Sequence, residues 1–206
     1  MKLSTAGESH GKCLVGIIEG LPSNLDIDID EINYYLALRQ SGYGRGGRQK
    51  IERDKVEILS GVRNLKTLAS PLAFVIKNAD YENWRGVMAP EGCDVSSKTL
   101  TKVRPGHADL TGMKKYAQSD ARNILERASA RETASRVVAG SIARQYLRAL
   151  GVEISGYVKS VCGIEDNGNY TFSQIEKAKD SPLFMLDKEA ESKAVKKIDS
   201  LKEAGD

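Results

Sequence analysis

Apolar residues occur along the chain in short runs that predict strands. The clearest run is Cys13–Glu19, which Gly20 and Pro22 follow as turn residues. Further runs of apolar and β-branched residues predict three more strands: Val56–Leu59, Pro71–Lys77 and Val152–Val161. Runs of this kind indicate strands on the scale of hairpins.

Other segments carry the signals of helices. Ala130–Leu150 places apolar residues three to four positions apart, as in a helix with one buried face. Asp30–Arg39 begins with an aspartate cap, at Asp28 or Asp30. Asp187–Ala204 has a narrow apolar stripe among Lys and Glu, which predicts a largely solvated helix. Because strands and helices alternate without a regular strand–helix–strand rhythm, the sequence predicts an α+β fold of antiparallel strands layered with helices.

Composition narrows the class of protein. The 206 residues are 40% hydrophobic and 29% charged, which suits one globular domain with at most a small appendage and excludes collagen-like, disordered and disulfide-scaffold chains. The polar first ten residues and the lack of a long apolar stretch predict neither a signal peptide nor a membrane span. Three cysteines without Cys-x-x-Cys spacing predict no disulfide framework and no zinc site, so we expect a cytoplasmic protein.

Positive charge is concentrated in one part of the chain. Residues 1–163 carry 24 Lys and Arg against 18 Asp and Glu, a net charge of +6, whereas residues 164–206 carry 7 against 10, a net charge of −3. All 13 arginines lie between Arg39 and Arg148. Because guanidinium groups bind carboxylates and phosphates with paired hydrogen bonds, this distribution predicts an anionic partner in the arginine-containing part.

Only two histidines occur, and both lie in polar, glycine-flanked stretches. His10 is in Gly-Glu-Ser-His-Gly at 7–11, and His107 is in Arg-Pro-Gly-His-Ala-Asp at 104–109. An imidazole between small turn residues is a poor candidate for core packing and titrates near neutral pH, so both are candidate acid–base groups. The alternative for each is a surface histidine hydrogen-bonded to a neighbour. A metal site is disfavoured, because two histidines without a helical i, i+4 pairing make a poor zinc site.

Residues 39–48, Arg-Gln-Ser-Gly-Tyr-Gly-Arg-Gly-Gly-Arg, combine glycines with three arginines. Glycines let the backbone approach an anion while guanidinium groups donate to it, so this Arg-Gly segment is a candidate phosphate or carboxylate clamp. The alternatives are a solvated basic loop and an Arg-Gly-Gly contact with nucleic acid. A net charge of only +3, scattered aromatic residues and two histidines without a role weigh against nucleic-acid binding.

A third motif, Glu-Arg-Ala-Ser-Ala-Arg-Glu-Thr-Ala at 126–134, lies at the start of the longest predicted helix. Ser129 and Glu132 fit a Ser-x-x-Glu capping box, which predicts free backbone N–H groups at this point. Arg127 and Arg131 would strengthen anion binding there. An ordinary capped helix with exposed arginines is the alternative, and the two other arginine-containing motifs favour a shared anionic site.

Together these motifs closely resemble chorismate synthase. The resembling segments are, in order, residues 7–11, 39–48, 104–109 and 127–134. The resemblance implies that phosphate and a ring hydrogen are eliminated from 5-enolpyruvylshikimate 3-phosphate to give chorismate, the last step of the shikimate pathway, with reduced FMN as cofactor. It also implies a sandwich with helices between sheets, assembled as a homotetramer.

The resemblance implies a role for each matching residue. His10 would protonate or stabilise the leaving phosphate, and His107 would lie beside the flavin. The implied substrate-binding residues are Ser9, Arg39, Arg45, Arg48, Arg104 and Arg131. The implied FMN-binding residues are Arg127, Ala128 and Ser129, and Arg39 and Arg45 would also meet NADPH in family members that reduce their own flavin.

The resemblance further implies that residues 1–206 form a single chorismate synthase-like domain that lacks its carboxyl-terminal part. The sequence stops at Gly205-Asp206, directly after a predicted helix, where a further connection is normally expected. Because the missing part would carry further flavin contacts, we expect weak FMN binding and little or no turnover from these residues alone. An inactive fragment with a structural or regulatory role is the alternative, and the acidic last segment is expected to lie outside the site.

Overall fold

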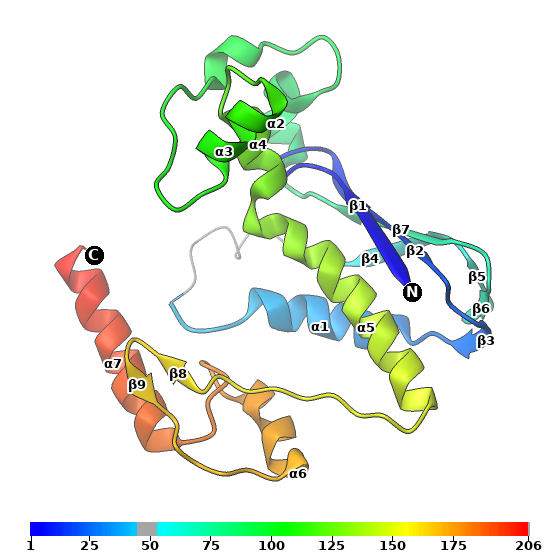
Figure 1. Ribbon diagram of the computed structural model, residues 1–206, viewed down its shortest axis with the longest axis vertical. Coiled ribbons are helices and arrows are strands. Elements are labelled where there is room, and N and C mark those ends of the chain that lie inside the picture. Colours follow the sequence, from blue (N-terminus) through cyan, green and yellow to red (C-terminus); the bar gives the residue numbers. More distant parts are fainter. Residues whose placement is uncertain (45–52, 206) are drawn as a thin grey trace.

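The computed structural model describes residues 1–44 and 53–205. At its centre is an antiparallel four-stranded sheet with the strand order β1-β2-β7-β4 (Figure 1). The strands are β1 (Lys2–Ala6), β2 (Cys13–Glu19), β7 (Leu72–Lys77) and β4 (Val56–Ser60). The two most apolar strands, β2 and β7, lie inside the sheet, where both of their edges are paired.

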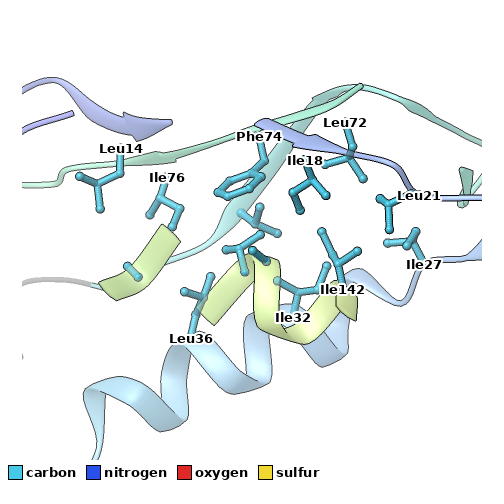
Figure 2. Close-up of a cluster of buried hydrophobic side chains, with 14 of the residues drawn as sticks. Leu14, Ile18, Leu21, Ile27, Ile32, Leu36, Leu72, Phe74, Ile76 and Ile142 are labelled. Atoms are coloured by element: carbon cyan, nitrogen blue, oxygen red, sulfur yellow. The ribbon is translucent and has the colours of Figure 1, made fainter. Parts of the chain in front are cut away.

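Two helices, α1 (Ile29–Gln40) and α5 (Thr133–Ala149), cover one face of this sheet (Figure 1). Because successive strand residues point to opposite faces, β2 and β7 turn alternate apolar side chains toward the helices. Figure 2 shows these side chains meeting those of the helices: Leu14, Ile18, Leu72, Phe74 and Ile76 from the strands, and Ile32, Leu36 and Ile142 from the helices. Each of them is at most 1% exposed, so this core fixes α5 against the sheet.

A smaller three-stranded sheet, β3 (Ser23–Asp26), β6 (Lys66–Leu68) and β5 (Val62–Arg63), lies beside the carboxyl end of α5. At the opposite end, next to the β1–β2 connection, four short elements gather (Figure 1). They are α2 (Tyr81–Met88), the 3₁₀ turn η2 (Val95–Lys98), α3 (Asp109–Tyr116) and α4 (Arg122–Ala128). A further 3₁₀ turn, η3 (Ala130–Glu132), joins α4 to α5.

The chain after α5 has its own small core. It contains the hairpin β8 (Ser160–Val161) and β9 (Ile164–Glu165), α6 (Phe172–Ile175), the 3₁₀ turn η4 (Glu176–Asp180) and α7 (Lys188–Ala204). Met185, Ala190 and Ala194 form the buried centre of this part. Tyr43 connects it to the Arg-Gly segment, because its backbone N–H donates to the carbonyl of Pro182 at 2.9 Å and its hydroxyl donates to Asp199 at 2.6 Å. The acidic last segment therefore adjoins the first half of the Arg-Gly segment.

Most of the predicted elements, and the α+β class, are confirmed. Cys13–Glu19 is β2 with the predicted bounds, and the other confirmed predictions are Val56–Leu59 as β4, Pro71–Lys77 as β7, Asp30–Arg39 as α1 and Asp187–Ala204 as α7. Asp28 is the cap of α1, since its side chain accepts a hydrogen bond from the backbone N–H of Glu31. Across residues 1–44 and 53–205, no helix has the length and apolar character needed to cross a membrane.

The strand predicted at Val152–Val161 is wrong over most of its length. Only Ser160 and Val161 pair with another strand, β9. Val152 and Ile154 are 46% and 50% exposed. A strand requires a partner for its backbone N–H and C=O groups, and an apolar sequence does not form one where no partner is aligned with it.

The contact between Gly16 and Phe74 gives a test of the core. A Cβ placed on Gly16 would lie 2.2 Å from Cζ of the buried Phe74 ring, whereas a Cβ on Gly140 of α5 would meet nothing within 4 Å. We expect Gly16→Ala to lower the free energy of unfolding by about 1–3 kcal/mol through overpacking. The matched control Gly140→Ala should raise it by about 0.5–1 kcal/mol through helix propensity. Urea unfolding followed by circular dichroism measures both, and equal effects of the two substitutions would contradict this account.

Candidate active site

The loop between β1 and β2 presents Ser9 and His10 to the end of α4. Nδ1 of His10 lies 2.9 Å from both carboxylate oxygens of Glu126, and the backbone N–H of His10 donates to Oε2 of Glu126 at 2.9 Å. The backbone N–H of Ser9 donates to the carbonyl of Glu126 at 2.9 Å. One residue of α4 therefore holds both the backbone of this loop and the edge of the imidazole.

Aromatic and cationic side chains surround the same imidazole. The ring of His10 stacks on Trp84 of α2, with centroids 3.9 Å apart and an interplanar angle of 26°. Arg122 lies over Trp84 and donates to Oε1 of Glu126 at 3.0 Å, and Lys98 also lies over Trp84. Burial alone would raise the pKa of Glu126, but hydrogen bonds from His10 and Arg122 outweigh burial and lower it. Glu126 is thus an ionised carboxylate at neutral pH, although it is only 1% exposed.

A second buried carboxylate, Asp54, joins two of the predicted arginines. Nη1 of Arg131 makes a short ion pair with Oδ2 of Asp54, and Nη1 of Arg39 lies 3.7 Å from the same oxygen. Arg39 also donates to Thr133 Oγ1 at 2.9 Å and to the carbonyl of Ala130 at 2.8 Å. The carboxyl end of α1 is therefore bound to the amino-terminal end of α5.

Asn78, just after β7, connects Arg131 to the histidine-containing loop. Its Oδ1 accepts from Nε of Arg131 at 2.9 Å, and its Nδ2 donates to the carbonyls of Glu8 and Gly11 at 3.1 and 2.6 Å. A single amide side chain thus uses both its donor and its acceptor functions between two motifs more than 100 residues apart. The structure brings together Ser9, His10, Arg39 and Arg131 as the sequence analysis expects.

The capping box predicted for Ser129 and Glu132 is wrong. Ser129 caps the short turn η3, because its hydroxyl accepts from the backbone N–H of Arg131, and it also donates to Ser9 Oγ at 3.1 Å. The side chain of Glu132 instead accepts from Thr5 at 2.9 Å and from Arg136 at 2.9 Å. Thr5 and Arg136 thus take up the carboxylate of Glu132, so it does not bond to the backbone N–H of Ser129. Arg131 is likewise not an exposed arginine, being 5% exposed.

Arg104 and His107 form a separate cluster around Asp109, the first residue of α3. Nδ1 of His107 makes a short contact with Oδ1 of Asp109, and the backbone N–H and Nε of Arg104 both donate to Oδ2 at 3.1 Å. Burial alone would raise the pKa of Asp109, but the hydrogen bonds from Arg104 and His107 lower it to about 2. Within the described ranges, no hydrogen bond or ion pair links this cluster to His10 or Arg131.

A cavity of about 490 Å³ between α3 and α4 lies next to both clusters. Ala108, which follows His107, lines one side of it, and Arg127 and Ala128 line another. Arg127 also donates to the carbonyl and the hydroxyl of Thr5, at 3.0 and 2.7 Å. Its Nη1 is buried without a hydrogen-bond partner among the described residues, 3.9 Å from Glu132. This volume is in the range of small-molecule sites.

A larger cavity, of about 800 Å³, lies at the other end of α5. Asp26, Asp28 and Glu31 line it, but Asp28 caps α1, Asp26 pairs with Lys66 and Glu31 pairs with Arg148. These carboxylates already have structural partners, and none of the predicted site residues that the structure describes lines this cavity. Of the predicted site residues, Arg45 and Arg48 lie outside the described residues.

Comparison with known proteins places this chain in a family. The family model for chorismate synthase matches residues 1–206. The chain belongs to the chorismate synthase family. It is 52% identical to the chorismate synthase of Alkaliphilus metalliredigens, 50% identical to that of Caldicellulosiruptor saccharolyticus and 48% identical to that of Thermus thermophilus. Each alignment covers all of this chain and 54 or 55% of the relative, so the chain spans about half the length of these curated relatives.

A crystal structure of chorismate synthase has the same fold over this region. It matches with a TM-score of 0.73 at 38% identity, covering 99% of this chain and 53% of that chain. Membership of the chorismate synthase family does not favour a basic nucleic-acid-binding module, the main alternative from the sequence.

Four residues that organise the candidate site were not predicted from the sequence: Asp54, Asn78, Trp84 and Glu126. Asp109 ends the motif at 104–109, but no role was predicted for it. Glu126 and Asp109 each lie within or beside a motif that contains a candidate residue, which was a usable signal. Asp54 and Asn78 lie outside all of the motifs, and only the folding of the chain brings them to Arg131.

The ion pair between Arg131 and Asp54 provides a stability test in this family member. Asp54→Asn should remove the short ion pair with the buried guanidinium of Arg131 and lower the free energy of unfolding by about 3–5 kcal/mol. The control Asp26→Asn removes a pair with Lys66 at 2.5 Å whose aspartate side chain is 81% exposed, and should cost less than about 1 kcal/mol. Denaturant unfolding measures both. A cost for Asp54→Asn as small as that of the control would show that the pair does not hold the two helices.

The lowered pKa of Asp109 predicts a pH dependence of stability. A carboxyl group whose pKa is lower in the folded state than in the unfolded state stabilises the fold above the unfolded value, about 3.9. This contribution is lost as the pH falls toward the folded value of about 2. The difference in melting temperature between the natural chain and Asp109→Asn should therefore be greatest above pH 4 and should shrink between pH 4 and pH 2. A difference that is constant over this range would rule out a depressed pKa.

Proposed function

We propose that these residues form the amino-terminal part of an enzyme that eliminates phosphate from 5-enolpyruvylshikimate 3-phosphate to give chorismate. The observation that carries the proposal is the convergence of Ser9 and His10 with Arg39 and Arg131 at the amino-terminal end of α5, in a chain that matches the family over its whole length. A substrate with one phosphate and two carboxylates requires several guanidinium groups. The departing phosphate requires a proton donor or a positive neighbour.

His10 is the proposed group that protonates or stabilises the departing phosphate. Nδ1 of His10 lies against the carboxylate of Glu126, so Nε2 is the imidazole nitrogen proposed to serve the substrate. Ser9, Arg39, Arg104 and Arg131 are the proposed substrate-binding residues in the described part of the chain. Arg45 and Arg48 are proposed for the same role on the family motif alone.

Reduced FMN is the proposed cofactor, and the cavity between α3 and α4 supports its binding. Arg127 and Ala128 line this cavity, and Nη1 of Arg127 is a buried donor without a hydrogen-bond partner among the described residues. Ser129 completes the proposed FMN-binding set, and His107, which precedes the cavity-lining Ala108, is the proposed neighbour of the flavin ring. When bound, reduced FMN supplies transient electron donation that weakens the bond between the ring carbon and the phosphate oxygen.

Three further proposals rest on family resemblance. NADPH would reach Arg39 and Arg45 if this family member reduces its own flavin. The complete enzyme would be a homotetramer. It would act in the cytoplasm on a small phosphorylated substrate.

A titration of FMN into the chain tests the proposed site. We expect weak binding that becomes tighter in the presence of 5-enolpyruvylshikimate 3-phosphate, measured by quenching of flavin fluorescence. Arg127→Ala should weaken FMN binding by about tenfold or more, because a charge-assisted hydrogen bond contributes about 1.5–3 kcal/mol. The control Arg63→Ala changes an exposed arginine of β5 and should leave binding unchanged. Binding that responds neither to the substrate nor to Arg127→Ala would contradict the proposed cofactor site.

A further inference from the structure

We propose that Glu126 is a positioning residue for His10, which holds the imidazole as the Nδ1–H tautomer and directs Nε2 to the substrate. This inference rests on the proposed function for the role of Nε2, but the tautomer itself is a property of the chain without ligand. It concerns a side chain that would never touch the substrate. Its role is to decide which nitrogen of His10 carries the transferable proton.

The geometry requires a donor at Nδ1. An ionised carboxylate only accepts hydrogen bonds, and both of its oxygens lie 2.9 Å from Nδ1 of His10. In the neutral imidazole the single proton must then lie on Nδ1, which leaves Nε2 as the acceptor. In the protonated imidazole both nitrogens carry protons, and Glu126 accepts only the one on Nδ1.

The carboxylate is itself held in place. Glu126 is 1% exposed, and Arg122, one helical turn earlier on α4, donates to its Oε1 at 3.0 Å. Its Oε2 also accepts from the backbone N–H of His10 at 2.9 Å. Because these bonds hold the acceptor independently of the imidazole, rotation of the ring would leave the buried carboxylate without one of its donors.

Trp84 fixes the plane of the imidazole, as Glu126 fixes its edge. The two rings are stacked at 3.9 Å, and Nε1 of Trp84 donates to Oδ2 of Asp80 at 2.9 Å. Two cationic groups, Arg122 on α4 and Lys98 on η2, lie over Trp84, and the carboxylates of Glu126 and Asp80 face the two rings. The imidazole is therefore constrained in rotation and in tilt.

The second histidine repeats the arrangement. Nδ1 of His107 contacts Oδ1 of Asp109, a carboxylate that is also 1% exposed, although Nη2 of Arg104 lies 3.0 Å from the same nitrogen. The chain has two histidines, and each has Nδ1 against a buried carboxylate. The repetition favours orientation of the imidazole over packing as the reason for burying these carboxylates, since packing alone would not select Nδ1 in both cases.

Nitrogen-15 NMR of the histidine side chains tests the proposal on the unliganded chain. Two-bond and three-bond couplings identify the protonated nitrogen, and His107→Gln assigns the two sets of signals. At a pH where the imidazole is neutral, we expect His10 of the natural chain to be almost entirely the Nδ1–H tautomer. A natural chain in which His10 is mainly the Nε2–H tautomer would overturn the proposal, whether or not any variant folds.

Two substitutions separate positioning from structure. Glu126→Gln keeps an acceptor oxygen and should retain the Nδ1–H tautomer. Glu126→Ala removes the acceptor and should shift His10 toward the Nε2–H tautomer while the His107 signals stay unchanged.

The tightening of FMN binding by 5-enolpyruvylshikimate 3-phosphate should survive in Glu126→Gln and fall at least tenfold in Glu126→Ala. An unchanged His10 tautomer in Glu126→Ala would overturn the positioning role. If the tautomer shifts in Glu126→Ala but the natural chain binds neither FMN nor the substrate, the positioning role stands and the proposed function is overturned.

Discussion

The site depends on the pairing of buried carboxylates with cationic and imidazole groups from distant parts of the sequence. An ionised carboxylate is costly to bury unless a positive or hydrogen-bonding partner compensates it. Asp54 meets this requirement through Arg131 and Arg39, which belong to motifs about 90 residues apart. Since each partner is costly to bury without the other, the pair can form only when β4, α1 and α5 have reached their final places. The chemistry of the site and the completion of the fold are therefore coupled.

The apolar core explains why this coupling occurs at one end of α5. The packing of α1 and α5 on β2 and β7 sets the position of the helix along the sheet (Figure 2). Beyond the core the same helix meets the β1–β2 loop, η3 and the end of α1, where apolar contacts give way to Asn78, Arg131 and Asp54. The core thus places the backbone, and the polar network selects the side-chain orientations that the proposed chemistry needs.

The elements with one apolar face could be predicted from the sequence, and those without one could not. β2, α1 and α7 have clear patterns or caps, whereas α2 has no buried residue and β1 is an edge strand with no fully buried residue. The histidines and arginines were recognisable as chemistry because of their residue types and glycine neighbours. Their partner Asp54 was not, because an acidic residue outside every motif gives no sign in the sequence that it will be buried against a particular cation. The capping box failed for a related reason: Thr5 and Arg136, one distant in sequence and one a helical turn away, compete for Glu132.

The attachment of Tyr43 to the part after α5 has a consequence for local opening of the molecule. Pro182 and Asp199 hold the backbone and hydroxyl of this residue, and they belong to a region whose hydrophobic cluster, among the described residues, has Met185, Ala190 and Ala194 as its buried members. A region with so little buried apolar surface opens at a lower free energy than the main core, as amide hydrogen exchange detects. Each such opening breaks both contacts of Tyr43. Tyr43 therefore shares a cooperative unit with α7, whereas Arg39, four residues earlier, is held to Ala130 and Thr133 at the start of α5.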